Sequence, residues 1–141
     1  MKTKPVLIGF FCVVVLIGAT SVYLALTIDR AEKSVVSLAA PDGKYKAVRV
    51  TFSNGGAAPF CFDTISVFLS VYPDSFAESD KSYEIYGAPC AASDRRAALP
   101  KMEWLTDKAL RITNAPGPGN PPRLKDHDAS HFVGVTFVKA K

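Results

Sequence analysis

Histidine and cysteine are scarce in this chain of 141 residues, which contains two histidines and three cysteines. No two cysteines are spaced C-x-x-C, so the sequence indicates neither a thiol-redox motif nor a zinc knuckle. It also lacks a G-x-S-x-G nucleophile elbow, and the pair Gly55-Gly56 is not followed by the Lys-Ser or Lys-Thr of a phosphate-binding loop. We therefore expect no enzyme activity and no cofactor.

The excess of positive charge is small. Lysine and arginine number 17 against 13 acidic residues, for a formal charge of +4. Without Lys2 and Lys4 this charge falls to about +2, and Arg95-Arg96 is the only adjacent basic pair. Nucleic-acid-binding domains carry a basic stripe or patch. We therefore expect no nucleic-acid partner.

Residues 5–28 contain no charged side chain. As a helix this segment would reach about 36 Å, enough to cross a hydrocarbon core of roughly 30 Å. Lys2 and Lys4 precede it, whereas the charges just after it cancel, so the positive-inside rule places the N-terminus in the cytoplasm. We expect a cytoplasmic tip at 1–4, a transmembrane signal anchor at 5–28 and a periplasmic or extracellular domain at 29–141. A cleaved secretory signal is the alternative.

Two cysteines, Cys61 and Cys90, lie outside the apolar segment. An even pair in an oxidising compartment favours a disulfide. Such a bond would close a loop of about 30 residues and contribute roughly 3 to 4 kcal/mol. Two independent buried thiols are the alternative.

Beyond residue 29, apolar residues recur with period two, which is typical of half-buried strands. The clearest case alternates Ile65, Val67, Leu69 and Val71 with Thr64, Ser66, Phe68 and Ser70. Segments with this pattern cover 36–38, 48–52, 65–71, 83–85, 102–104, 110–112 and 133–137. The pattern predicts about seven strands.

Short turns separate several of these strands. Asp42-Gly43 suits a tight hairpin between the first two, and Thr106-Asp107-Lys108 suits a second hairpin before Leu110. Consecutive strands with short connections pair antiparallel. The predicted fold is therefore mainly β, with an N-terminal transmembrane helix followed by a small antiparallel β sandwich or meander.

The last connection is long. Four prolines and two glycines fall between residues 114 and 122, and no apolar pattern returns before residue 131. We predict a flexible loop over 114–131. It is either a solvated connector or a contact surface, because long loops are often functional.

Two stretches resemble a known group of proteins. They are Ala40-Pro41-Asp42-Gly43-Lys44-Tyr45, and Trp104 followed by Leu110-Arg111-Ile112. The pattern is similar to that of small uncharacterised bacterial membrane-anchored or periplasmic proteins with an S-P-D-G-K-Y opening hairpin and a later W…L-x-I strand pair. This chain has Ala40 where serine is usual. The resemblance implies the β fold and the envelope location, and it brings no assigned activity.

His127 and His131 are the candidate metal ligands. At positions i and i+4 they would share one face of a helix. Pro121, Pro122 and the strand expected near Phe132 argue against a helix, which favours a polar turn and no metal site.

Five residues are candidates for contact with a partner. Arg49 and Arg111 alternate with apolar strand positions, and Phe62, Phe68 and Tyr72 alternate away from the set expected to be buried. Exposed apolar patches mark interaction sites. We expect these side chains to lie on the exposed faces of the sheet.

The leading hypothesis is a non-enzymatic, membrane-tethered protein whose β domain binds another envelope protein or an incoming protein. It would act as an immunity protein, as an inhibitor or as part of an assembly. The first alternative is a small hydrolase or metal-binding protein that uses His127 and His131. The second alternative is a purely structural role, in which the membrane segment 5–28 itself recruits the partner and the β domain only caps that segment.

Overall fold

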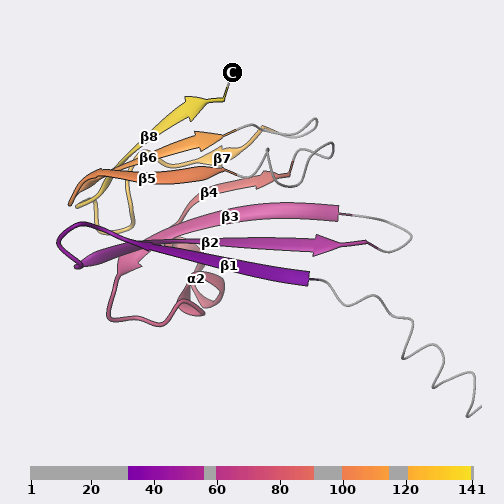
Figure 1. Ribbon diagram of the computed structural model, residues 1–141, viewed down its shortest axis with the longest axis horizontal. Coiled ribbons are helices and arrows are strands. Elements are labelled where there is room, and N and C mark those ends of the chain that lie inside the picture. The colour runs from indigo at the N-terminus through magenta and orange to yellow at the C-terminus, as the bar shows by residue number, and fades with distance from the viewer. Residues whose placement is uncertain (1–31, 56–59, 91–99, 115–120, 141) are drawn as a thin grey trace, which may run out of the picture.

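The computed structural model describes residues 32–55, 60–90, 100–114 and 121–140 (Figure 1). Their strands form two sheets. Sheet A has the order β1-β2-β3-β4-β7, with antiparallel neighbours throughout. Its strands are β1 (Glu32–Ala39), β2 (Tyr45–Asn54), β3 (Phe60–Leu69), β4 (Glu84–Pro89) and β7 (Arg123–Leu124). Sheet B contains β5 (Lys101–Thr106), β6 (Ala109–Asn114) and β8 (Gly134–Lys139), in the order β5-β6-β8.

The prediction of a mainly β domain is confirmed. Eight strands occur in the described residues, where the sequence indicated about seven. The predicted membrane segment at 5–28 lies outside the described residues. Among the residues described, no helix is long and apolar enough to cross a membrane.

Both predicted hairpins are present. Between β1 and β2, Gly43 takes φ +71°, its amide donates to the Ala40 carbonyl, and Asp42 Oδ1 accepts from the Lys44 amide at 2.9 Å. Between β5 and β6, Thr106 Oγ1 accepts from the Lys108 amide at 3.2 Å. Local turn chemistry therefore sets these two registers.

The expectation that all strand pairs are antiparallel is wrong for one of them. Strands β6 and β8 pair in parallel, with Leu110 opposite Val135 and Ile112 opposite Phe137. After β6 the chain crosses to sheet A, forms β7 beside β4, and returns to sheet B as β8. Because of this excursion, β8 enters sheet B in the same direction as β6.

The two sheets pack against each other through a shared apolar core. Sheet A contributes Ala47, Ile65, Val67, Ile85, Tyr86 and Ala88; sheet B contributes Leu110, Ile112, Val135 and the adjoining Val133. Alternate residues of β3, β6 and β8 face this core, as the period-two pattern predicts. In β4 the consecutive residues Ile85 and Tyr86 both face it, where the register with β3 shifts.

A second core covers the other face of sheet A. Helix α2 (Phe76–Ser79) and the 3-10 helix η1 (Lys81–Tyr83) lie over Val48, Val50 and Phe68. The Phe68 ring packs edge-on against Phe76 at 5.2 Å, and only 1% of the residue is exposed. The prediction that Phe68 lies on an exposed face is therefore wrong, because residues 76–83 bury that face.

The prediction of a flexible loop over 114–131 also differs from the structure. Residues 115–120 lie outside the described residues, but Arg123–Leu124 form β7 on the edge of sheet A. Beyond β7, the Lys125 amide donates to the Ile85 carbonyl and the Val135 amide donates to the Asp126 carbonyl. These bonds hold the C-terminal part of the segment against both sheets.

Candidate functional site

Residues 126–133 form a compact turn built around Asp128. This residue is 2% exposed, and its Oδ1 accepts from the Val133 amide at 2.8 Å. The other oxygen, Oδ2, accepts from both the amide and the hydroxyl of Ser130. His131 closes the turn at φ +60°, and its amide donates to the Asp128 carbonyl. A buried aspartate that satisfies three donors fixes the turn's conformation.

This turn brings His127 and His131 together. Their ring centroids are 4.2 Å apart, with planes inclined by 43°. Asp126 Oδ1 lies 2.5 Å from His127 Nδ1. The predicted polar turn before the last strand is confirmed, and it juxtaposes the two imidazoles without a helix. In the described residues, no set of three or more His, Cys, Asp or Glu side chains is arranged to hold a metal ion.

Two adjoining hollows flank the segment after β7. One, of about 360 Å³, is lined by Ser82 and by residues 124–129 and 131. The other, of about 350 Å³, is lined by Lys81, by residues 84–86 and by residues 123–125. Leu124 and Lys125 line both hollows, and the Lys125 ammonium donates to the Ser82 carbonyl at 3.2 Å.

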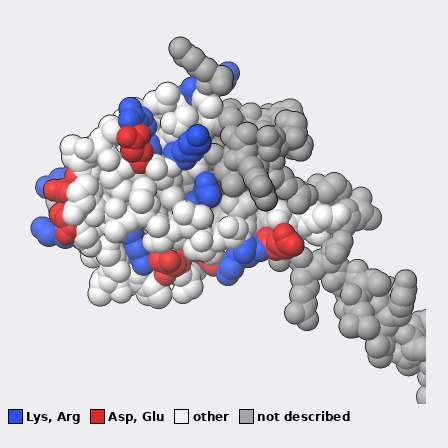
Figure 2. Space-filling view, in the orientation of Figure 1, with Lys and Arg blue, Asp and Glu red and all other residues white. Residues whose placement is uncertain are grey.

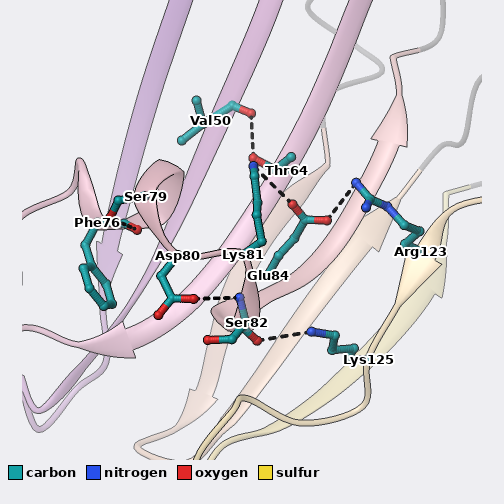
Figure 3. Close-up of polar contacts among 10 residues, drawn as sticks. All are labelled: Val50, Thr64, Phe76, Ser79, Asp80, Lys81, Ser82, Glu84, Arg123 and Lys125. Carbon is teal, nitrogen blue, oxygen red and sulfur yellow. Dashed lines mark hydrogen bonds and ion pairs between the residues drawn. The ribbon is translucent and has the colours of Figure 1, made fainter.

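Glu84, which is among the residues lining the second hollow, has a buried carboxylate (Figure 3). The Glu84 side chain is 8% exposed; its Oε1 lies 2.9 Å from Arg123 Nη2, and its Oε2 lies 3.5 Å from Lys81 Nζ. A β-bulge in β4, opposite the step from Ile65 to Ser66 in β3, shifts the register here. The pairing therefore places Glu84 on the face that also carries Gly87. The ion pairs tie η1 and β7 to β4.

A polar cluster lies inside the apolar core between the sheets. Asp63, 1% exposed, accepts a hydrogen bond from the Thr51 hydroxyl at 2.5 Å. Burial raises the pKa of Asp63, although the Thr51 hydrogen bond and the Arg49 charge act in the opposite direction. Burial, with the nearby Asp63 charge, raises the pKa of Tyr86 to about 12. Since these groups are enclosed by the sheets, we assign them a structural role.

The predicted contact residues do not form one patch. Arg49 points inward and its Nη1 donates to the Pro100 carbonyl at 2.7 Å, whereas Arg111 pairs with Glu103 on sheet B at 2.8 Å. Tyr72 stacks on Phe76 at 4.6 Å beside α2. Phe62 is partly buried beneath the Arg123 guanidinium, 5.7 Å away, and Phe68 is buried.

The sequence did not single out the most exposed apolar strand. All eight residues of β1 are exposed, among them Val35 (39%), Val36 (40%) and Leu38 (37%). Strand β1 stands at one edge of sheet A, and β2 is its only neighbour among the described strands. The sequence feature that indicates this exposed apolar edge is the adjacent pair Val35 and Val36, because consecutive strand residues place apolar side chains on both faces of β1.

The predicted disulfide is present. Cys61 and Cys90 are joined, with their Cα atoms 5.2 Å apart, and the Cys90 amide donates to the Cys61 carbonyl. The bond links the start of β3 to the end of β4.

Comparisons with known proteins add no assignment. No family model, no curated protein and no solved structure matches this chain. On the face of the molecule that Figure 2 shows, basic and acidic side chains are interspersed.

Proposed function

We propose that this chain is a non-enzymatic, membrane-tethered envelope protein whose β domain binds an extended segment of another envelope or incoming protein along β1. The supporting observation is the edge itself, which is eight residues long and exposed throughout. Unpaired strand edges bind extended peptides by strand addition, in which main-chain hydrogen bonds supply affinity.

The pattern of hydrogen bonds identifies which backbone groups are available. The Ala40 amide donates to the Tyr45 carbonyl, so this pair is hydrogen-bonded. Such pairs alternate along an antiparallel ladder. Given the register of β1 on β2, the backbone groups of Leu38 and Val36 point toward β2, and those of Ser37 and Val35 point away from it. An incoming strand would pair with Val35 and Ser37.

The side chains of β1 would supply specificity. Val36 and Leu38 share the face of sheet A that carries Ala47, whereas Val35 shares the face that carries Val50. Both faces of the edge are therefore apolar. A partner segment with apolar residues at successive positions would bury surface on each face of the extended sheet.

The location rests on the charge-free segment at 5–28, which would tether the domain four residues before β1 begins. In this arrangement residues 29–141 lie on the periplasmic or extracellular side. The disulfide between Cys61 and Cys90 is in keeping with that compartment.

The test compares Ser37→Pro with Ser37→Ala in the full chain. Proline at position 37 removes an outward amide donor, and edge strands tolerate proline. After chemical cross-linking in native membranes and affinity capture, we expect Ser37→Ala to recover the partner at the wild-type level and Ser37→Pro to lose most of it. Equal recovery by both variants would contradict binding at β1.

A further inference from the structure

The pair of histidines His127 and His131 has no part in strand addition at β1. Their ring centroids are 4.2 Å apart at the rim of a hollow of about 360 Å³. The His127 side chain is 40% exposed. Two neighbouring imidazoles with access to solvent are able to ligate one metal ion, since each metal–nitrogen bond is about 2.0 to 2.1 Å long.

Asp126 orients one of the two rings. Its Oδ1 lies 2.5 Å from His127 Nδ1, which favours the proton on Nδ1 and leaves the lone pair on Nε2. Histidines that bind metals usually place a carboxylate or carbonyl against their second nitrogen in this way. In this proposal Asp126 is thus a positioning residue rather than a ligand.

The turn holds the two rings without help from a metal ion. Asp128 fixes the segment between the histidines through bonds to Ser130 and Val133, and the Asp128 amide donates to the Val133 carbonyl. His127 also forms a bridge with Gly134 at the start of β8. A site that is already ordered costs less conformational entropy on binding.

We propose that His127 and His131 bind one divalent transition-metal ion through two imidazole nitrogens, with the remaining coordination positions open to water. Imidazole ligands suit Cu²⁺, Ni²⁺ and Zn²⁺. Of these three ions, Cu²⁺ generally has the highest affinity for a given set of nitrogen ligands. Magnesium and calcium prefer sites made of oxygen ligands. The site therefore selects for a borderline metal, with Cu²⁺ the tightest.

The test uses the full-length protein in detergent, with Cu²⁺ as the probe. Electron paramagnetic resonance and titration calorimetry should show one equivalent of Cu²⁺ with nitrogen hyperfine structure from two imidazoles. His127→Ala and His131→Gln should each abolish the two-nitrogen spectrum. Asp126→Asn should weaken binding about 10- to 100-fold while both imidazoles remain bound, the usual loss when such a carboxylate is removed.

Asp107→Asn is the matched control, since it removes an exposed carboxylate in the turn between β5 and β6. It should leave Cu²⁺ affinity unchanged. The circular dichroism spectrum of each variant reports whether the β domain is folded. The proposal is overturned if the wild-type chain binds Cu²⁺ no more tightly than the His127→Ala/His131→Gln double variant, or if its spectrum shows no imidazole nitrogen. Neither result would bear on partner binding at β1.

Discussion

The Trp104 indole Nε1 donates a hydrogen bond to the Leu38 carbonyl at 3.0 Å, joining residues that are 66 positions apart. Trp104 belongs to β5 in sheet B and packs against the core between the sheets, whereas Leu38 belongs to β1 in sheet A. This hydrogen bond connects the exposed edge strand β1 to strand β5 of the facing sheet B. The β1 edge is therefore held by sheet B as well as by its ladder with β2.

Trp104→Phe should loosen β1. The substitution keeps an aromatic ring in the core and removes the donor to Leu38, a loss of about 1 kcal/mol in the free energy of unfolding. Urea denaturation measures this loss, and faster amide hydrogen exchange in β1 should accompany it. Leu105→Ala, at an exposed neighbour, is the control and should change stability by less than about 0.5 kcal/mol. If amide hydrogen exchange in β1 is unchanged in Trp104→Phe, the hydrogen bond from Trp104 to Leu38 does not stabilise this strand.

Gly87→Ala should disturb the ion pair between Glu84 and Arg123. A Cβ atom at position 87 would lie 2.8 Å from Glu84 Oε1 and 3.0 Å from Arg123 Nη2, so both side chains must move. We expect a loss of about 1 to 2 kcal/mol, typical of overpacking. Gly134→Ala is the matched control, because its Cβ atom would meet nothing nearer than 3.9 Å. Thermal unfolding that ranks the two variants equally would refute the steric argument.

Asp63→Asn tests the buried carboxyl. Burial raises the pKa of Asp63 above its ordinary value of 3.8, so the folded state binds this proton more tightly than the unfolded state does. Its contribution to stability is therefore fully present below pH 3.8 and is lost as pH rises through the elevated pKa.

At pH 7 we accordingly expect Asp63→Asn to unfold at a higher urea concentration than the wild type. This advantage should shrink as the pH falls through the raised pKa of Asp63 and should change no further below pH 3.8. The amide oxygen that the substitution introduces is still able to accept from the Thr51 hydroxyl. The exposed Asp107→Asn variant should show no comparable gain. If Asp63→Asn is less stable than the wild type at pH 7, the folded state favours the charged form of Asp63, which would contradict the raised pKa.

Removing the disulfide should cost the domain much of its stability. In the chain-entropy model, a loop of about 30 residues is worth roughly 3 to 4 kcal/mol. The Cys61→Ala/Cys90→Ala double variant should lose this amount in chemical denaturation, and reduction of the wild type should reproduce the loss. Cys12→Ala keeps the pair intact and serves as the control. A double variant as stable as the wild type would show that the bond does not constrain the unfolded chain.

The features that the sequence predicted correctly are local. Asp42 and Gly43 specify a hairpin through their own backbone and side-chain bonds, and the alternation of Ile65 and Val67 specifies which side of β3 faces sheet B. The pairing of Cys61 with Cys90 followed from their being the two cysteines outside the apolar segment.

The features that it missed depend on contacts between distant segments. Phe68 alternates as an exposed residue would, and it is buried only because α2 folds back over that face. The parallel pairing of β8 with β6 follows from the crossing to β7, for which no turn motif exists. The polar turn at 126–131 was predicted, but the contact between His127 and His131 was not, because it depends on the bonds from Ser130 and Val133 to Asp128.

Photocross-linking from β1 is a direct probe of peptide binding at this edge strand. A photoreactive amino acid at Ser37, in the full chain and in intact producing cells, should form one discrete protein adduct, while the same group at Thr136 on the exposed part of β8 should form none. Adducts of equal yield from both positions, or no adduct from Ser37, would contradict the account of β1 as the binding edge.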